Sequence, residues 1–208
     1  MNDGRQGRAI GLIATIAMLG WAATQFVQFV VALDFVAGDG VYVWFGTARV
    51  VALTAVVALI VTFVVGPIFL VWIYRAMAIA RELSPSLTIT PGWAVGWFFV
   101  PIASLFKPVE VLNEIITGSG VSAPAQAQRA RALISWWWGC WIVRAICGLF
   151  TSFMQRSSED GGAVLTSGMV KILAFSSALG VVAALVFVMI IQRVTKMQRS
   201  AVDVEIFA

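Results

Sequence analysis

Apolar residues form five runs along this chain, separated by shorter polar stretches. Four runs reach the roughly 20 apolar residues that an α-helix needs to cross a bilayer. They cover about residues 9–33, 50–74, 133–154 and 169–192. The first run follows Arg5 and Arg8 and ends without a clear small-x-small cleavage motif, which favours an uncleaved helix over a signal peptide. The pattern therefore predicts four membrane-spanning helices.

The remaining run, Pro91–Pro108, differs from the other four. Its apolar part has about 15 residues and is interrupted by Pro101, so it is too short to cross a bilayer as a regular helix. Trp93 and Trp97 lie four residues apart, on one face of a helix. Two arrangements fit this pattern. The run either lies in the membrane interface with the tryptophans as anchors, or it re-enters the membrane and lines a cavity.

The distribution of lysine and arginine tests whether this run crosses the membrane. If it does not cross and the N-terminus is cytoplasmic, ten of the 14 basic residues face the cytoplasm and two face outside. If it crosses, the counts become five and seven. Basic residues favour the cytoplasmic side, so the pattern predicts four spans with both termini in the cytoplasm. The ten residues are Arg5, Arg8, Arg75, Arg81, Lys107, Arg129, Arg131, Arg193, Lys196 and Arg199.

The stretch after this run predicts one more helix. Val109, Leu112 and Ile116 form an apolar stripe at helical spacing, which is typical of an amphipathic helix lying on a membrane. No polar stretch is long enough to fold a second domain, so residues 1–208 are expected to form a single integral membrane domain. The predicted fold is all-α and multi-pass: four transmembrane helices, one interfacial or re-entrant segment at about 91–108, and an amphipathic cytoplasmic helix.

Composition agrees with a membrane protein and gives little support to catalysis. The chain is 61% hydrophobic and 12% charged, whereas soluble domains contain about 25% charged residues. It has no histidine, the commonest general base and metal ligand. Cys140 and Cys147 are separated by about 10 Å of helical rise, too far for a disulfide within one chain. We expect no enzyme activity, no cofactor and no metal site, and the basic residues are too scattered for nucleic acid.

Several sequence runs together resemble a known family. They are WIYRAMAIAREL at 72–83, PGWAVGWFFVPIASLFKPVEVLNEI at 91–115, SWWWGCW at 135–141 and IIQRVTKMQ at 190–198. Over about residues 71–198 the chain resembles the bacterial domain of unknown function 4328 family. The resemblance implies a bacterial multi-pass membrane protein with no assigned activity, and it supplies no catalytic residue. The family pattern has asparagine where this chain has Ile79, and often at Ser104, so a polar site formed by those asparagines would be incomplete here.

Arg144 is the strongest single candidate for a functional residue. It follows Arg131 by 13 residues, or about 20 Å along the fourth helix, and so lies inside the hydrocarbon core. A cation there usually faces the bundle interior and has a partner. Gln25, Gln28 or a backbone carbonyl is the expected partner, because no acidic residue is obviously placed at that depth. Arg144 either contacts an anion or substrate, or it extends to the outer headgroups.

Six polar residues surround the 91–108 segment at its cytoplasmic side: Arg75, Arg81, Glu82, Lys107, Asn113 and Glu114. They form either a pocket for a partner or an anionic headgroup, or a solvated edge that anchors the helix ends. Small residues at Ser176, Gly180 and Ala184 predict a close-packing face for a neighbouring helix or a second copy of the chain. Together with Arg144, the candidate residues are Arg75, Arg81, Trp93, Trp97, Pro101, Ser104, Lys107, Asn113 and Glu114.

Two functions follow from these features. The first is a non-catalytic protein of the bacterial plasma membrane that binds a membrane or cytoplasmic protein partner, or a lipid, at its cytoplasmic face. The second is a small transporter or channel component that uses Arg144 and a re-entrant segment at 91–108. In both cases the lipid bilayer is the surrounding partner, and a homo-oligomer is a further candidate assembly.

Overall fold

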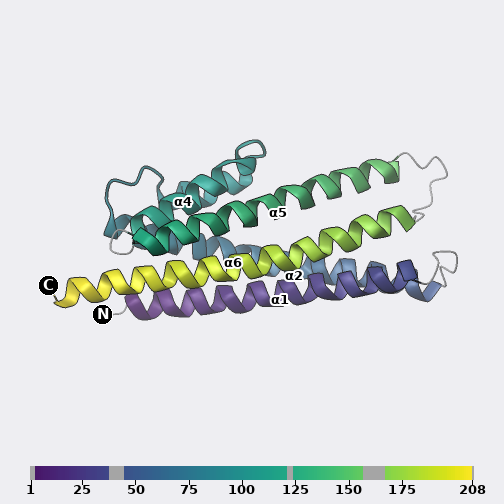
Figure 1. Ribbon diagram of the computed structural model, residues 1–208, viewed down its shortest axis with the longest axis horizontal. Coiled ribbons are helices and arrows are strands. Elements are labelled where there is room, and N and C mark those ends of the chain that lie inside the picture. Colours follow the sequence, from purple (N-terminus) through teal and green to yellow (C-terminus); the bar gives the residue numbers. More distant parts are fainter. Residues whose placement is uncertain (1–2, 38–44, 121–123, 157–166, 208) are drawn as a thin grey trace.

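The computed structural model describes residues 3–37, 45–120, 124–156 and 167–207, and these residues form helices and short turns without any strand (Figure 1). Four helices are long: α1 (Asp3–Ala37), α2 (Phe45–Leu83), α5 (Pro124–Arg156) and α6 (Ser167–Phe207). Each contains a stretch long and apolar enough to cross a membrane. The prediction of an all-α, multi-pass membrane fold with four transmembrane helices is therefore confirmed.

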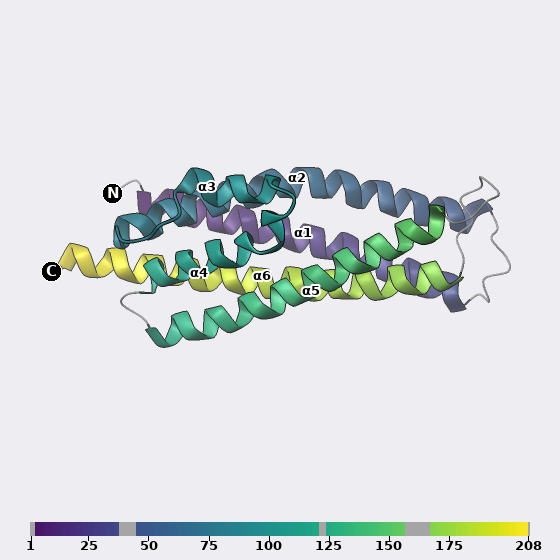
Figure 2. The ribbon, with the colours of Figure 1, turned by 90° about the horizontal axis from the view of Figure 1, so that it is seen from above.

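The four long helices lie side by side, and the two chain ends are at the same end of the bundle (Figures 1 and 2). Helix α6 is central, since it packs against α1, α5, α4 and α2. Its Phe187 is fully buried and its ring lies 5.0 Å from that of Phe69, 5.5 Å from Trp72 and 5.2 Å from Trp137. Aromatic residues of three helices thus meet at one point near the middle of α6 and hold these helices together.

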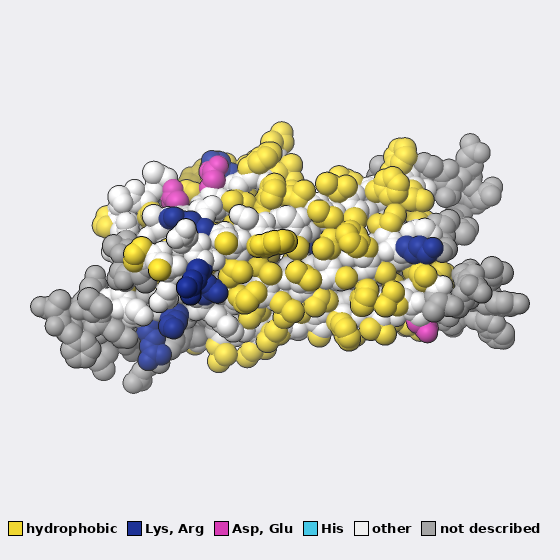
Figure 3. Space-filling model, in the orientation of Figure 1, with side chains coloured by type: hydrophobic (Ala, Val, Ile, Leu, Met, Phe, Trp, Pro, Cys, Tyr) yellow, Lys and Arg dark blue, Asp and Glu magenta, His cyan; other side chains and the backbone are white. Residues whose placement is uncertain are grey.

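The outside of the bundle is apolar along its middle. Figure 3 shows hydrophobic side chains covering this region, whereas lysine and arginine gather near the end that carries the termini. Phe63 on α2 and Leu149 on α5 are each 73% exposed. Large apolar side chains directed outward along a whole helix are expected where lipid, not water, surrounds the protein.

The segment between α2 and α5 turns back on itself. It contains α3 (Pro91–Gly96), the 3₁₀ turns η1 (Trp97–Phe99) and η2 (Ala103–Leu105), and α4 (Lys107–Ser119). In Figure 2, α3 runs along α2 toward the middle of the bundle, and α4 returns toward the end from which α3 came. We call residues 91–119 the hairpin.

Local sequence explains how the hairpin turns. The side chain of Thr90 accepts a hydrogen bond from the Trp93 amide and Pro91 opens α3, a favourable helix start. After Pro101, the Ser104 amide donates to the Val100 carbonyl at 2.7 Å and the Ser104 hydroxyl donates to the Pro101 carbonyl at 2.7 Å. These bonds stabilise the turn at which the chain reverses its direction. As Figure 2 shows, α3 begins and α4 ends toward the same end of the bundle, so the 91–108 segment does not run the length of the bundle.

The apolar stripe of α4 faces protein. Leu112, Ile115 and Ile116 have no exposed surface and belong to the main core. Helix α4 packs against α2, α5 and α6. Gly118 allows a close approach, since a Cβ there would lie only 2.6 Å from the Ala80 carbonyl oxygen. The expected amphipathic helix thus packs in the bundle, and its stripe is directed away from lipid.

Candidate functional site

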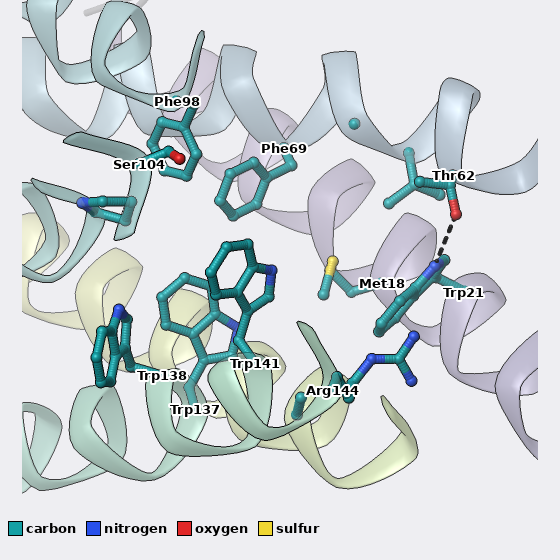
Figure 4. Close-up of a pocket in the computed structure, with 14 residues that line it drawn as sticks. Met18, Trp21, Thr62, Phe69, Phe98, Ser104, Trp137, Trp138, Trp141 and Arg144 are labelled. Carbon is teal, nitrogen blue, oxygen red and sulfur yellow. Dashed lines mark hydrogen bonds between the residues drawn. The ribbon is translucent and has the colours of Figure 1, made fainter. Parts of the chain in front are cut away.

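A cavity of about 270 Å³ lies between α2 and α5. α2 packs against α1, α3, α4 and α6, whereas α5 packs against α4 and α6, so α2 and α5 do not pack directly against each other and a gap remains between them. The hairpin borders one end of the cavity, as Phe98 and Ser104 show in Figure 4. Thr62 and Trp141 are exposed, so the cavity reaches the outer surface of the bundle. Its lining residues are Met18, Trp21, Thr62, Val65, Gly66, Phe69, Phe98, Ser104, Pro108, Trp137, Trp138, Trp141, Arg144 and Ala183.

Arg144 lies at the end of the cavity away from the hairpin, beside Trp21 (Figure 4). Its Nη1 donates to the Gln25 Oε1 at 3.2 Å and to the Ser176 carbonyl at 2.6 Å. Its guanidinium carbon lies 5.2 Å from the centre of the Trp21 ring, a cation–π contact. Gln25 and a backbone carbonyl are therefore the partners, as the sequence predicts, whereas Gln28 donates to the Thr54 carbonyl.

Gly180 makes room for this arginine. A Cβ at Gly180 would collide with Arg144 Nη1 and would lie 3.0 Å from Arg144 Cζ and 3.1 Å from Gln25 Cδ. The sequence predicts a close-packing face at Gly180. Within this chain the space next to Gly180 is occupied by the guanidinium and by its amide partner.

Among the described residues, the Arg144 guanidinium contacts only uncharged groups: two hydrogen-bond acceptors and the Trp21 ring. No carboxylate of those residues lies within ion-pair distance of the guanidinium. Arginine has five N–H donors, and the hydrogen bonds to Gln25 and to the Ser176 carbonyl both come from Nη1. An anionic group that entered the cavity would find a cation already positioned and without a counter-charge among these residues.

Tryptophans form most of the remaining wall. Trp21 Nε1 donates to the Thr62 hydroxyl at 3.1 Å, which joins α1 to α2 at the level of Arg144. Trp137 and Trp141 project from α5 into the cavity (Figure 4). Trp138 borders the hairpin end, and its indole N–H is buried without a hydrogen-bond acceptor among the described residues.

Two of the residues predicted on the cytoplasmic side, Arg81 and Glu114, form hydrogen bonds to the loop between α2 and α3. Arg81 Nη1 donates to the carbonyls of Leu87 and Ile89, each at 3.1 Å. Glu114 accepts from the Thr88 hydroxyl and from the Ile89 amide. These two charged side chains hold residues 84–90 from both sides and so fix where α3 begins.

The other candidates lie on the hairpin and near it. Lys107 pairs with Glu110 and lies 5.5 Å from the Trp97 ring centre, and Trp97 lies 4.8 Å from Trp93. Pro101 is exposed at the turn, Asn113 is half-buried on α4, and Arg75 is exposed on α2. Only Ser104 and Arg144, of all predicted site residues, line the same cavity.

Metal-binding geometry is not seen in the described part of the chain, where no group of three or more His, Cys, Asp or Glu side chains converges. Cys140 and Cys147 are both free and half-buried on α5. The site therefore offers hydrogen-bond donors and aromatic rings, without a nucleophile–base pair among the residues that line it.

The sequence alone did not single out Trp21, Thr62, Trp138 or Gly180 as site residues. Trp138 belongs to a run of three tryptophans, and only packing decides which of them face inward: Trp136 is 71% exposed and Trp137 is 8% exposed. Trp21 and Thr62 each place a polar side-chain atom inside an apolar run of the sequence, and this was the only feature that could have marked them as site residues.

Comparison with family models identifies the family. The model of the domain of unknown function (DUF4328) matches residues 36–196. The chain belongs to this family. The matched range covers α2 to α5, the hairpin and most of α6, and it extends further toward the N-terminus than the quoted runs. Trp21 and Gln25 on α1 lie before it. No curated protein and no solved structure matches the chain.

Proposed function

We propose that this protein binds a lipid-soluble anionic amphiphile in the cavity between α2 and α5, inside the membrane and without catalysing a reaction. Arg144 carries the proposal. A cation on a membrane-spanning helix is costly and commonly marks a functional site. Here neutral oxygens and the Trp21 ring hold it at one end of an apolar cavity, so a carboxylate or phosphate of the ligand would provide the missing counter-charge.

The walls of the cavity suit the rest of such a molecule. Ligand sites are typically apolar, with a few positioned polar groups that set orientation. Phe69, Trp137 and Trp141 offer aromatic surface along the cavity. Because the cavity reaches the bundle surface between α2 and α5, an amphiphile dissolved in the bilayer would enter sideways.

The face that carries the chain ends has weaker support as a binding surface. Arg81 and Glu114 use their polar atoms on the loop at residues 84–90. Arg75 and Asn113 remain available there, without a common pocket. We therefore favour the cavity over binding of a protein partner at that face.

We further propose that both termini and the hairpin lie on the cytoplasmic side of a bacterial plasma membrane, because basic residues favour that side. In a variant without Cys140 and Cys147, Ser86→Cys is expected to resist an impermeant thiol reagent in intact cells. Lys171→Cys, near the opposite end of the bundle, is expected to react. Reaction of Ser86→Cys in intact cells would reverse the proposed orientation.

Binding of radiolabelled stearic acid to the purified protein in neutral-lipid nanodiscs tests the proposed function. A hydrogen-bonded charge contact contributes about 1.5–3 kcal/mol, so Arg144→Leu should weaken binding about 10- to 100-fold. Lys171→Leu removes an exposed cation from another helix and should leave affinity within about twofold. Stearyl alcohol, which has no charge, should compete poorly. Equal affinity in wild type and Arg144→Leu, with both folded by circular dichroism, would reject the proposal.

A further inference from the structure

The turn of the hairpin, residues 99–106, presents large apolar side chains to the outside of the molecule. Ile102 is 78% exposed, Phe99 is 71% exposed and Phe106 is 60% exposed. Phe63, within the stretch of α2 that is apolar enough to cross a membrane, is exposed to a similar extent. A cluster of exposed apolar side chains of this size marks a surface that contacts a membrane or another protein.

The backbone of this turn forms hydrogen bonds within the turn itself. Three of its amides donate to three of its carbonyls at 2.7–3.2 Å: Ser104 to Val100, Leu105 to Ile102 and Phe106 to Ala103. Pro101 has no N–H, and its carbonyl accepts from the hydroxyl of Ser104, which is the only polar side chain in residues 98–106. Non-helical backbone at membrane depth needs partners within the protein, because lipid offers none. The turn supplies such partners, and its inner side borders the cavity through Ser104.

Aromatic and charged side chains lie at the base of the turn. The Trp97 ring lies 4.8 Å from the ring of Trp93 and 5.5 Å from Lys107 Nζ, and Lys107 pairs with Glu110. Tryptophan favours the interface between lipid and water, and lysine extends its charge toward the headgroups. Figure 3 shows charged side chains beside the apolar surface, on the side of the chain ends, where the hydrophobic band of the long helices also begins. The hairpin therefore has the order of side chains that is typical of the edge of a bilayer.

From these observations we infer that the hairpin is re-entrant. Its turn, residues 99–106, inserts into the membrane leaflet on the side of the chain ends and contacts the acyl chains of the lipids there, while Trp93 and Lys107 lie near the headgroups. Because α3 packs along α2 and runs toward the middle of the bundle (Figure 2), Ile102 lies deeper than Trp93. The inference concerns the outer side of the hairpin, so it holds whether or not the cavity binds a ligand and whichever side of the membrane the chain ends face.

Spin labels on single cysteines test this inference in the full-length protein in lipid nanodiscs. In a variant without Cys140 and Cys147, collisions of the label with oxygen, which dissolves in hydrocarbon, are compared with collisions with a water-soluble nickel chelate. The oxygen-to-nickel ratio at Ile102→Cys should exceed several-fold the ratio at Ser86→Cys, in the exposed loop before α3. It should approach the ratio at Phe63→Cys, and Trp93→Cys should give an intermediate value.

All labelled positions are exposed, so the substitutions leave the core intact, and Phe99→Cys provides a second reporter at the turn. Equal ratios at Ile102→Cys and Trp93→Cys would show that the hairpin lies in the plane of the interface. Nickel access at Ile102→Cys equal to that at Ser86→Cys would place the turn in water. Exclusion of both reagents would show that a second copy of the chain covers the turn. Each of these three results would overturn the inference.

Discussion

Replacing Gly180 by alanine is expected to disrupt the arginine site through one added methyl group. The new Cβ would collide with Arg144 Nη1 and would lie 3.0 Å from Cζ of the same side chain. Tight contacts against a flexible side chain are relieved by moving it, so the guanidinium should leave its place. It would then lose its bonds to Gln25 and to the Ser176 carbonyl, and its contact with Trp21.

The cost can be worked from these three contacts. Hydrogen bonds between membrane helices contribute about 0.6 kcal/mol each on average, and a cation–π contact contributes about 0.5–1 kcal/mol. The expected loss is about 2 kcal/mol in the free energy of unfolding. For a chain of this size it corresponds to a fall in Tm of about 4–8 °C. Thermal unfolding in detergent, followed by tryptophan emission or circular dichroism, measures it.

Gly20→Ala is the matched control, since Gly20 is exposed on α1 and a Cβ there would have no neighbour within 4 Å. It reports the gain in helix propensity alone, about 1 kcal/mol at most. In an Arg144→Leu background the guanidinium is absent, so Gly180→Ala should lose most of its effect. Equal shifts for Gly180→Ala and Gly20→Ala, or an unchanged cost in that background, would refute the assignment of this space to Arg144.

Two further predictions concern contacts outside the cavity. Glu114→Ala removes the acceptor for the Thr88 hydroxyl and the Ile89 amide. The loop should then open more often, so chymotrypsin should cleave after Leu87 about tenfold faster. Glu110→Ala, which loses one exposed ion pair, should leave the cleavage rate nearly unchanged. Gln198→Leu removes buried bonds to the Ala76 carbonyl and to the Ser119 hydroxyl and should destabilise the protein by about 1–2 kcal/mol in thermal unfolding. Gln192→Leu, at an exposed position of the same helix, should leave the stability nearly unchanged. Equal cleavage rates for Glu114→Ala and Glu110→Ala, or equal stabilities for Gln198→Leu and Gln192→Leu, would contradict these assignments.

Features that depend on length and composition were accessible from the sequence. Four apolar runs predicted the four long helices, because a bilayer imposes a minimum span. The short run at 91–108, with Pro101 inside it, predicted a segment that does not cross, and the structure shows it turning back. The helices extend past the apolar runs at the end that carries the termini. Helix α6 continues to Phe207, although its apolar run ends near residue 192, because polar residues can continue a helix beyond the membrane and the apolar pattern does not show where that helix ends.

Features that depend on packing were not accessible. The apolar stripe of α4 is the same whether the helix lies on lipid or on protein, so the pattern could not show that Leu112 and Ile116 are buried in the core. Charged residues at a helix end look alike in sequence whether they bind a partner or hold a loop, as Arg81 does. The depth of Arg144 could be predicted, but its cavity is formed by helices distant in the chain, including the hairpin.

Photo-crosslinking tests the central claim, that the cavity between α2 and α5 binds an anionic amphiphile, most directly. Stearic acid with a diazirine on its chain would be irradiated with the protein in nanodiscs, and the modified residues would be mapped by mass spectrometry. The account predicts labelling of cavity residues such as Met18, Phe69 and Trp141, and its loss in Arg144→Leu. Labelling confined to outward-facing residues such as Phe63 and Leu149, and unchanged in that variant, would contradict it.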